Sequence, residues 1–364
     1  MTELPDPLRQ IEAHAYQRRR RRIGLAANVV ELAALVAIVA VTGAVGGWWA
    51  LVLLVAGLFL LGLPFGYAGY RLSRAHGLSR QTTAGWLADR LKGAAIGLVL
   101  GGAAAAALIG IQRAAGDWWP LPAWIAIVAF SAVLAALWPV LLLPIFLRSE
   151  PMAAGDLADT LWETARRANV HVRDMRLLKM GEKTAAANAM VAGLGPTVRI
   201  YVSDTLAETE EGEDEGGALA RTRVVLAHEL GHHVHGDMWR LMAVSAASLA
   251  VGMLGAWAAV EAFAPDGAGH VSTLPSVVLG FTLASAVVSP LVAAYSRRRE
   301  RAADAYAADL AGEGETFARA MERLVARNLS ELEPPRLYHL LTSSHPTPAE
   351  RIAVARAGGR VPAA

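Results

Sequence analysis

Apolar residues along the chain are gathered into long runs instead of recurring at the period of an amphipathic helix or strand. Six runs approach or exceed 20 residues, which is about the length that a helix needs to cross the hydrocarbon core of a bilayer. Buried helices of a soluble core would be shorter and more often interrupted by polar residues. The pattern therefore predicts six transmembrane helices: Ile23–Val45, Trp48–Tyr70, Gly93–Ile111, Trp124–Leu147, Leu241–Phe263 and Leu274–Tyr295. The fourth contains Trp138-Pro139, which predicts a kink or a break into a span and a re-entrant piece.

Basic residues lie on alternate sides of these predicted spans. Arg18 to Arg22 precede the first span, the segment 71–92 is basic, and Arg297 to Arg301 follow the sixth, whereas the opposite connections carry only Arg113. Because basic loops stay in the cytosol, both termini and the segment 148–240 are expected there. An aromatic belt is expected at the outer face, formed by Trp48, Trp49, Trp118 and Trp119.

The spans divide the chain into four parts. Residues 1–147 form a four-span membrane block with a basic cytosolic loop at 71–92, and residues 148–240 form a cytosolic segment of mixed composition. Two further spans occupy 241–295, and a cytosolic segment follows at 296–364. The basic residues before the first span, and the length of that span, indicate a retained membrane helix and not a cleaved secretory signal.

The segment 148–240 has the patterns of a small α+β unit. Ala153–Asn169 is amphipathic at the helical period, and the short alternations at Asp174–Met180 and Val198–Ser203 predict strands. Glu208–Gly217 carries six acidic residues and three glycines, which predicts a solvated flexible loop with at most a weak regulatory or cation-binding role. Ala218–His235 then predicts a helix that leads almost directly into the fifth span.

Composition narrows the chemistry. Apolar residues make up 54% of the chain and charged residues 18%, and the formal net charge is only +2, so a nucleic-acid partner is not indicated. The lipid bilayer is the partner that the apolar runs predict. The chain has no cysteine, which excludes disulfides, thiolate metal ligands and a cysteine nucleophile.

Residues 228–233 read HELGHH, the strongest chemical motif in the chain. On a helix His228 and His232 project from the same face, so both imidazoles can bind one metal ion. Glu229 lies beside them, where its carboxylate can take a proton from a water molecule activated by zinc. HExxH also arises by chance, so its context matters.

A catalytic zinc site usually has three protein ligands. Without cysteine, the third must be His, Asp or Glu. Glu300 follows the sixth span in the helix-like stretch Tyr295–Ala307, and Asp304 lies one turn further on the same face. A solvated juxtamembrane helix with topogenic arginines is the alternative interpretation of this stretch. If the fifth and sixth spans are neighbours, however, Glu300 and His232 emerge together at the cytosolic membrane face.

Several independent blocks resemble the integral-membrane gluzincin peptidases, which include the CAAX prenyl endopeptidases and the HtpX-type heat-shock proteases. They are HELGHH, SRRRERAADAYA after the sixth span, ANAMVAGLGPTVRIYVSDTL at 187–206 and SSHPTPAERI at 343–352. The segments 64–92 and 141–152 are more similar to the CAAX endopeptidase branch. The chain departs from that branch at Gly77-Leu78-Ser79, where Gly-Phe-Asn is usual, and in having six predicted spans instead of the seven of eukaryotic members.

The resemblance implies a mainly α polytopic membrane protein with about six transmembrane helices and a cytosolic α+β gluzincin-type zinc peptidase domain. It implies one zinc ion per chain, with His228, His232 and Glu300 as ligands. Glu229 would then be the general base, and Asp304 would hold a ligand histidine from behind.

The same resemblance implies a substrate-binding side to this site. His345 would stabilise the tetrahedral oxyanion, supported by Arg351. Asn188 and Ala189 would form the edge against which the substrate lies as an added strand. From the residues alone, His345 is a loop histidine before a proline and Asn188 an ordinary turn residue.

Weaker candidates are His233 and His235, whose helical phase points away from the ligand face, and Glu31 within the first span. Intramembrane carboxylates are suspected of function by default, so Glu31 either lines a cavity between spans or faces a neighbouring helix.

The leading hypothesis is a zinc endopeptidase that acts on membrane-associated or juxtamembrane protein and peptide substrates. Prenyl-type processing and quality control of membrane proteins are the two substrate hypotheses, and the Ala- and Arg-rich composition favours a bacterial cytoplasmic membrane and broader proteolysis. A membrane scaffold or transporter with a structural zinc is the alternative, with His233 or His235 as fourth ligand. The intact Glu229 argues against it, and the sequence indicates no oligomeric state.

Overall fold

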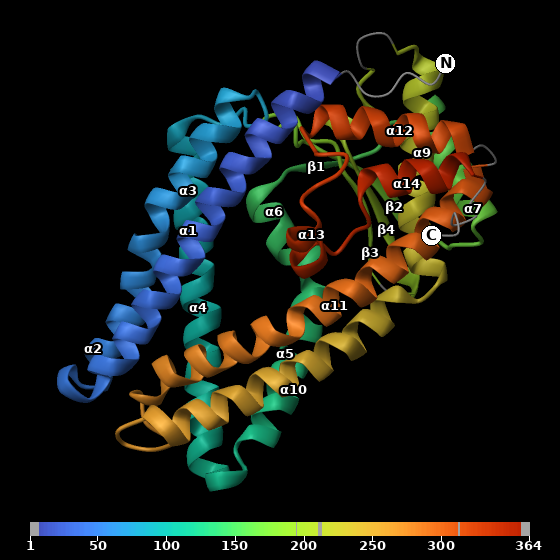
Figure 1. The fold of residues 1–364 in the computed structure, drawn as a ribbon. Helices are drawn as coiled ribbons and strands as arrows, with labels where there is room; N and C mark the ends of the chain where they lie inside the picture. Colours follow the sequence, from blue (N-terminus) through green and yellow to red (C-terminus); the bar gives the residue numbers. More distant parts are fainter. Residues whose placement is uncertain (1–6, 194, 210–212, 312–313, 358–364) are drawn as a thin grey trace.

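The computed structural model describes residues 7–193, 195–209, 213–311 and 314–357. Long helices dominate it, and a small α/β unit lies at the end of the molecule where α1 begins and α11 ends (Figure 1). The long or membrane-spanning helices are α1 (Pro7–Val45), α3 (Leu58–Ala75), α4 (Thr83–Ala115), α5 (Pro120–Leu137), α10 (Asp237–Phe263) and α11 (Thr273–Ala311). Short helices are α2 (Gly47–Val52) and α6 (Leu143–Phe146).

Six helical stretches are long and apolar enough to cross a membrane, in the places that the apolar runs predict. The fourth changes at Trp138–Leu142 into a π-helical turn before α6, so the predicted irregularity at Trp138-Pro139 is confirmed. Proline has no N–H to donate into the helix, which explains why the regular hydrogen bonding fails there. A second π-helical turn, Leu53–Gly57, joins α2 to α3.

One of the four tryptophans assigned to an outer aromatic belt is buried. Trp119 has no exposed surface and packs with Met253, Ala256 and Val260 of α10. The prediction for Trp119 is therefore wrong. Trp48, Trp49 and Trp118 are exposed, as a belt requires.

The α/β unit contains a four-stranded sheet in the order β1-β2-β4-β3, formed by β1 (Ser149–Pro151), β2 (Asp174–Leu178), β3 (Ala189–Ala192) and β4 (Arg199–Ser203). The two predicted strands correspond to β2 and β4, which pair in parallel, while β1 and β3 pair antiparallel at the two edges. The helices of the unit are α7 (Asp156–Arg167), α8 (Asp204–Ala207), α9 (Glu215–Val234), α12 (Gly314–Arg327), α13 (Arg336–Thr342) and α14 (Pro348–Arg356).

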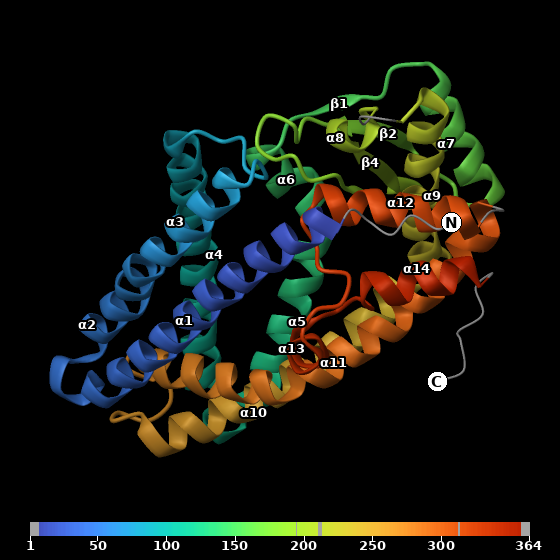
Figure 2. The same ribbon diagram turned by 45° about the horizontal axis from the view of Figure 1, so that its top comes forward.

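The hydrophobic core of this unit lies between the sheet and its helices. Leu161 of α7, Ile200 and Val202 of β4, and Leu226 and Leu230 of α9 are fully buried together. The alternation in β4 places its apolar side chains against α7 and α9, which fixes the register of the strand. Helix α9 contacts β3, α7 and α12, and these contacts hold it in place (Figure 2).

The acidic tract Glu208–Gly217 is less solvated than predicted. Residues 210–212 lie outside the described residues, but the Glu213 carboxylate is 3% exposed and accepts from buried Arg221 at 2.9 Å. Asp214 caps the first turn of α9, which begins at Glu215. In the described part of the tract Glu208 and Thr209 are exposed as predicted, whereas Glu213 is held in a buried ion pair and α9 begins three residues before the predicted start at Ala218.

Two of the junctions between the membrane helices and the α/β unit are formed by α1 and α11. The polar first half of α1 runs beyond the membrane span, and its Gln17 donates to the Leu329 carbonyl at 2.7 Å while Arg21 pairs with Glu331. The second junction is α11, a single helix that carries the sixth span and continues to Ala311. α10 and α11 pack together, with Gly252 against the Phe281 ring, so the fifth and sixth spans are neighbours.

Candidate active site

Helix α9 presents the two histidines of HELGHH. Asp214 accepts from the Gly217 N–H at 2.8 Å at its start, and the chain leaves it through Gly236, whose φ of 63° is left-handed and suits glycine. His228 and His232 lie one turn apart with their rings edge to face, 4.8 Å between centroids.

Glu300 of α11 meets both rings. Its Oε2 is 3.3 Å from His228 Nε2 and its Oε1 is 3.3 Å from His232 Nε2. One atom from each of the three side chains lies within 4.8 Å of the others, and this is the one such group of metal-ligating residues among the described ranges. Glu300 Oε2 is buried without a hydrogen-bond partner in the described structure.

A carboxylate stands behind each histidine. His228 Nδ1 lies 2.9 Å from Asp304 Oδ1, and His232 Nδ1 lies 2.9 Å from Asp237 Oδ2. Both rings therefore turn Nε2 toward Glu300. Fixing one ring nitrogen in this way is the usual means of orienting a metal-binding imidazole.

An arginine in turn neutralises each of these carboxylates. Arg351 of α14 donates to both oxygens of Asp304 at 2.8 and 2.6 Å, and Arg299 donates to Asp237 at 2.5 Å. The two histidines are thus held by parallel arginine–carboxylate pairs. Bidentate arginine pairs fix geometry as well as charge.

The site is electrostatically suited to a cation. Burial lowers the pKa of His228, but the neighbouring carboxylates of Asp304 and Glu300 outweigh burial and raise that pKa to about 9. Burial raises the pKa of Glu229, since its charged form loses water, although the nearby histidines oppose this.

A cavity of about 540 Å³ opens beside the cluster. Its wall includes His228, Glu229, His345 and Arg351. His345 Nε2 lies 3.5 Å from Glu300 Oε1, and its ring is partly exposed. The residues that are expected to act on a substrate therefore border one cavity. The side chain of Arg351 forms its described hydrogen bonds with Asp304 and His228.

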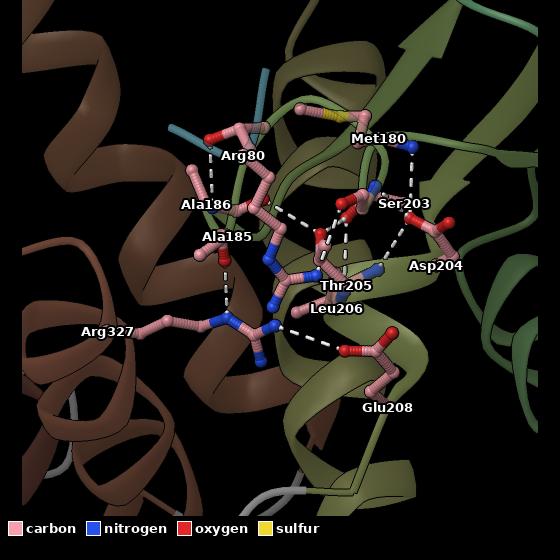
Figure 3. Close-up of polar contacts among 12 residues, drawn as sticks. Arg80, Met180, Ala185, Ala186, Ser203, Asp204, Thr205, Leu206, Glu208 and Arg327 are labelled. Carbon is pink, nitrogen blue, oxygen red and sulfur yellow. Dashed lines mark hydrogen bonds and ion pairs between the residues drawn. The ribbon is translucent and has the colours of Figure 1, made fainter. Parts of the chain in front are cut away.

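Asn188 and Ala187 border the same cavity, and Ala189 begins β3, an edge strand of the sheet. Asn188 N–H donates to Ser203 Oγ at 2.9 Å, and its carbonyl accepts from the Ser203 N–H at 2.9 Å. Figure 3 shows Ser203 within a polar network that holds the chain entering this strand. The hydrogen bonds between Asn188 and Ser203 of β4 therefore help to hold the start of β3 at the cavity wall that includes His228 and Glu229.

The weaker candidates lie elsewhere. The His235 ring packs against Tyr306 at 5.6 Å, and His233 borders a separate hollow near His171. Glu31 Oε1 faces Gly62 of α3, so this carboxylate is directed at a neighbouring helix. Neither His233 nor His235 joins the metal-ligating group found among the described residues.

Sequence reasoning missed Asp237 and Arg299. Asp237 is five positions beyond His232 and belongs to the next helix, so helical phase could not relate the two. One signal for Asp237 was available in the sequence. Asp237 directly follows Gly236, the glycine at the end of the HELGHH helix, and an acidic side chain in this position can contact the last turn of that helix.

Comparisons with known proteins identify the family to which this fold belongs. A family model described as peptidase family M48 matches residues 151–358. A second, described as CAAX prenyl protease N-terminal, five membrane helices, matches residues 10–148. Four of the candidate spans lie in this N-terminal part of the chain.

Individual relatives extend over most of the chain. The metalloprotease YhfN of Bacillus subtilis is 30% identical over 305 residues, 80% of this chain and 69% of that protein. A CAAX prenyl protease 1 homologue of Arabidopsis thaliana is 28% identical over 80% of this chain and 68% of its own length. The crystal structure of S. mikatae Ste24p has the same fold, with a TM-score of 0.75 at 21% identity, covering 84% of this chain and 74% of that one.

Proposed function

The chain belongs to peptidase family M48 and is a membrane metalloprotease, and on that premise we propose that it is a zinc-dependent endopeptidase with Glu229 as its general base. One observation carries the proposal: His228, His232 and Glu300 converge while both imidazoles are held from behind by carboxylates. Because the chain belongs to a peptidase family, the alternative hypothesis of a non-catalytic membrane scaffold or transporter is set aside.

The donor set fits zinc. Two imidazole nitrogens and a carboxylate are a common ligand set for catalytic zinc, and the buried Glu300 Oε2 has an unused acceptor site in the described structure. We propose one zinc per chain, held by His228, His232 and Glu300. When bound, zinc supplies Lewis acidity to the attacking water and to the scissile carbonyl.

The chain's own residues would then move protons and hold charge. The Glu229 carboxylate takes a proton from the water as its oxygen attacks the carbonyl carbon, and gives that proton to the amine as the C–N bond breaks. In this proposal His345 donates to the oxygen that becomes negative, and Arg351 supports the site by fixing Asp304 behind His228. The raised pKa of Glu229 suits a group that must both accept and return a proton.

We further propose that substrates bind as an added strand along Asn188 and Ala189 at the edge of the sheet. The residue ranges 148–240 and 296–364 would form the peptidase unit, with 1–147 and 241–295 as its membrane parts. The basic residues support an orientation with both termini and the site in the cytosol, in a bacterial cytoplasmic membrane.

The position of the site relative to the membrane indicates the class of substrate. α9 leads into the fifth span and α11 comes directly from the sixth, so the site lies close to the membrane boundary. Membrane-attached or juxtamembrane peptides suit such a site. The proposed activity is broad proteolysis of such segments, and comparing farnesylated with unmodified copies of one peptide tests this against prenyl-directed processing.

Glu229→Gln tests the function. The amide keeps the shape of the side chain but cannot take a proton, so zinc content is expected to stay near one per chain while cleavage of fluorogenic peptides falls by at least about 100-fold. Zinc is measured by mass spectrometry on detergent-purified protein. Glu163→Gln, on the exposed face of α7, is the control and is expected to retain both its zinc content and its peptidase activity. Undiminished proteolysis by the Glu229→Gln protein would rule out the proposed base.

A further inference from the structure

The short segment 183–186, which leads into Asn188 and β3, is held by contacts from three parts of the chain. One of these parts is the loop 76–82 between α3 and α4, which belongs to the membrane block. The other two are the residues that follow β4 and the end of α12. The segment is the last stretch of chain before the cavity wall.

The membrane-block loop pairs with the segment through its backbone. The Arg80 N–H donates to the Lys183 carbonyl at 2.9 Å, and the Ala185 N–H donates to the Leu78 carbonyl at 3.1 Å. Ser79 and Thr184 form an antiparallel β-bridge between them. The loop thus adds a short extra strand pairing at the entrance to β3.

Thr184 joins the two sides with its hydroxyl. Its Oγ1 donates to the Leu78 carbonyl at 3.0 Å and accepts from the Ala186 N–H at 3.1 Å. An ion pair reinforces the junction, because Lys183 Nζ lies 2.5 Å from Asp89 Oδ2 at the start of α4.

The opposite side of the segment is held by the peptidase unit (Figure 3). Thr205 Oγ1 donates to the Ala186 carbonyl at 2.8 Å, and Arg327 Nε donates to the Ala185 carbonyl at 2.7 Å. Asp204 Oδ1 accepts three backbone N–H groups, from Met180, Gly181 and Thr205, at 2.9 to 3.0 Å. One carboxylate oxygen therefore ties the start of the turn that precedes the segment to the residues that follow β4.

These contacts determine where the cavity wall lies. Ala187 and Asn188, the next two residues, border the cavity with His228 and Glu229. A peptide that adds to an edge strand is read through its main chain, so a shift of that edge weakens every hydrogen bond at once. Holding the edge before substrate arrives removes an ordering cost from binding.

We propose that the α3–α4 loop, acting through Leu78 and Thr184, positions the substrate-binding edge strand β3, so that the membrane block helps to set how tightly a peptide binds. This inference rests on the proposed function. The loop departs from the CAAX endopeptidase pattern at Gly77-Leu78-Ser79, which includes the two residues at the junction. Thr184 is accordingly a positioning residue that need not touch the reacting atoms.

Thr184→Val tests the inference, because valine keeps the shape of threonine without its hydroxyl. With the fluorogenic peptide that the wild type cleaves best, KM is expected to rise about tenfold while kcat stays within about threefold. Zinc content stays at the wild-type level. Thr184→Ser restores the hydroxyl and brings KM back toward the wild-type value. Thr160→Val, on α7, none of whose residues border the cavity, is the matched control.

A second pair of variants, at Asp204, tests the inference independently in case Thr184→Val does not fold. Asp204→Ala removes the acceptor of three N–H groups and is expected to raise KM about as much as Thr184→Val does. Asp204→Asn keeps an acceptor oxygen at this position and is expected to bring KM back toward the wild-type value. A wild-type KM in folded Thr184→Val and Asp204→Ala proteins would overturn the inference alone. A fall in kcat at constant KM, or loss of zinc, would overturn it too. A wild-type protein without peptidase activity would refute the proposed function and this inference with it.

Discussion

At the scale of single residues, Asp237 is the least expected part of the site. It is buried, holds His232 Nδ1 at 2.9 Å, and is itself held by Arg299. Asp304 does the same for His228, with Arg351 behind it. Each of the two proposed ligand histidines therefore has its own carboxylate and arginine, and these pairs come from α10, α11 and α14.

Asp237→Asn is expected to weaken zinc binding by about 10- to 100-fold, since the amide carries no charge to orient and polarise His232 and leaves Arg299 without its anion. Competition with a chelator of known affinity measures the change. Asp159→Asn, at an exposed position of α7, serves as the control. An unchanged zinc affinity in the Asp237→Asn protein would show that this carboxylate does not support the site.

Part of the proposed site follows from spacing, and Asp237 does not. Spacing relates His228, Glu229 and His232 to one another and Glu300 to Asp304, whereas joining the two groups needed neighbouring spans and the family resemblance. Asp237 and Arg299 come from α10 and α11 and meet only because the chain reverses at Gly236 and the two helices pack together. Contacts that depend on a turn and on helix packing leave no periodic signal.

At the scale of elements, the site depends on the crossing of α9 and α11. Gly231, inside HELGHH, lies against α11, where an added Cβ would be 3.2 Å from Ala303 Cα and 3.3 Å from the Ala303 carbonyl oxygen. Ala303 lies between Glu300 and Asp304. The missing side chain at Gly231 thus lets α11 bring both carboxylates within reach of the histidines.

Gly231→Val is expected to push α11 away, lowering zinc affinity and peptidase activity together and destabilising the fold by about 1–3 kcal/mol. Zinc titration and thermal unfolding in detergent measure the two effects. Gly97→Val, in α4 where a Cβ would meet open space, provides the matched control for helix propensity. Wild-type zinc affinity in the Gly231→Val protein would contradict the role assigned to this crossing.

Long elements were predictable and short ones were not. The apolar runs placed all six spans, and alternation located β2 and β4. β1 and β3 have three and four residues and are defined by their pairing with β2 and β4, so they carry too little pattern of their own. Trp119 was misplaced because burial by α10 is a tertiary effect that an aromatic residue near a span end does not reveal.

At the scale of the whole molecule, the membrane helices and the α/β unit are one working assembly. α1 extends from its span to the segment around Leu329, α11 carries Glu300 beyond the sixth span, and the α3–α4 loop pairs with residues 183–185. The proposed orientation follows from the basic residues on one side of the spans.

Single cysteines test this orientation, and the chain contains none that must first be removed. His270→Cys, in the exposed turn between α10 and α11, is expected to react with a membrane-impermeant maleimide in intact cells. Glu163→Cys, on α7, is expected to react only after the membrane is opened. Labelling of Glu163→Cys alone in intact cells would reverse the proposed orientation.

Peptide cleavage as proposed depends on a catalytic zinc site formed by His228, His232 and Glu300. The most direct measurement is the zinc content of purified Glu300→Ala protein beside the wild type, with the rate of peptide cleavage determined on the same samples. Loss of one of three ligands is expected to leave zinc well below one per chain and to abolish cleavage, while the wild type holds about one zinc and is active. Glu300→Ala protein that retains stoichiometric zinc and cleaves at the wild-type rate would contradict the claim.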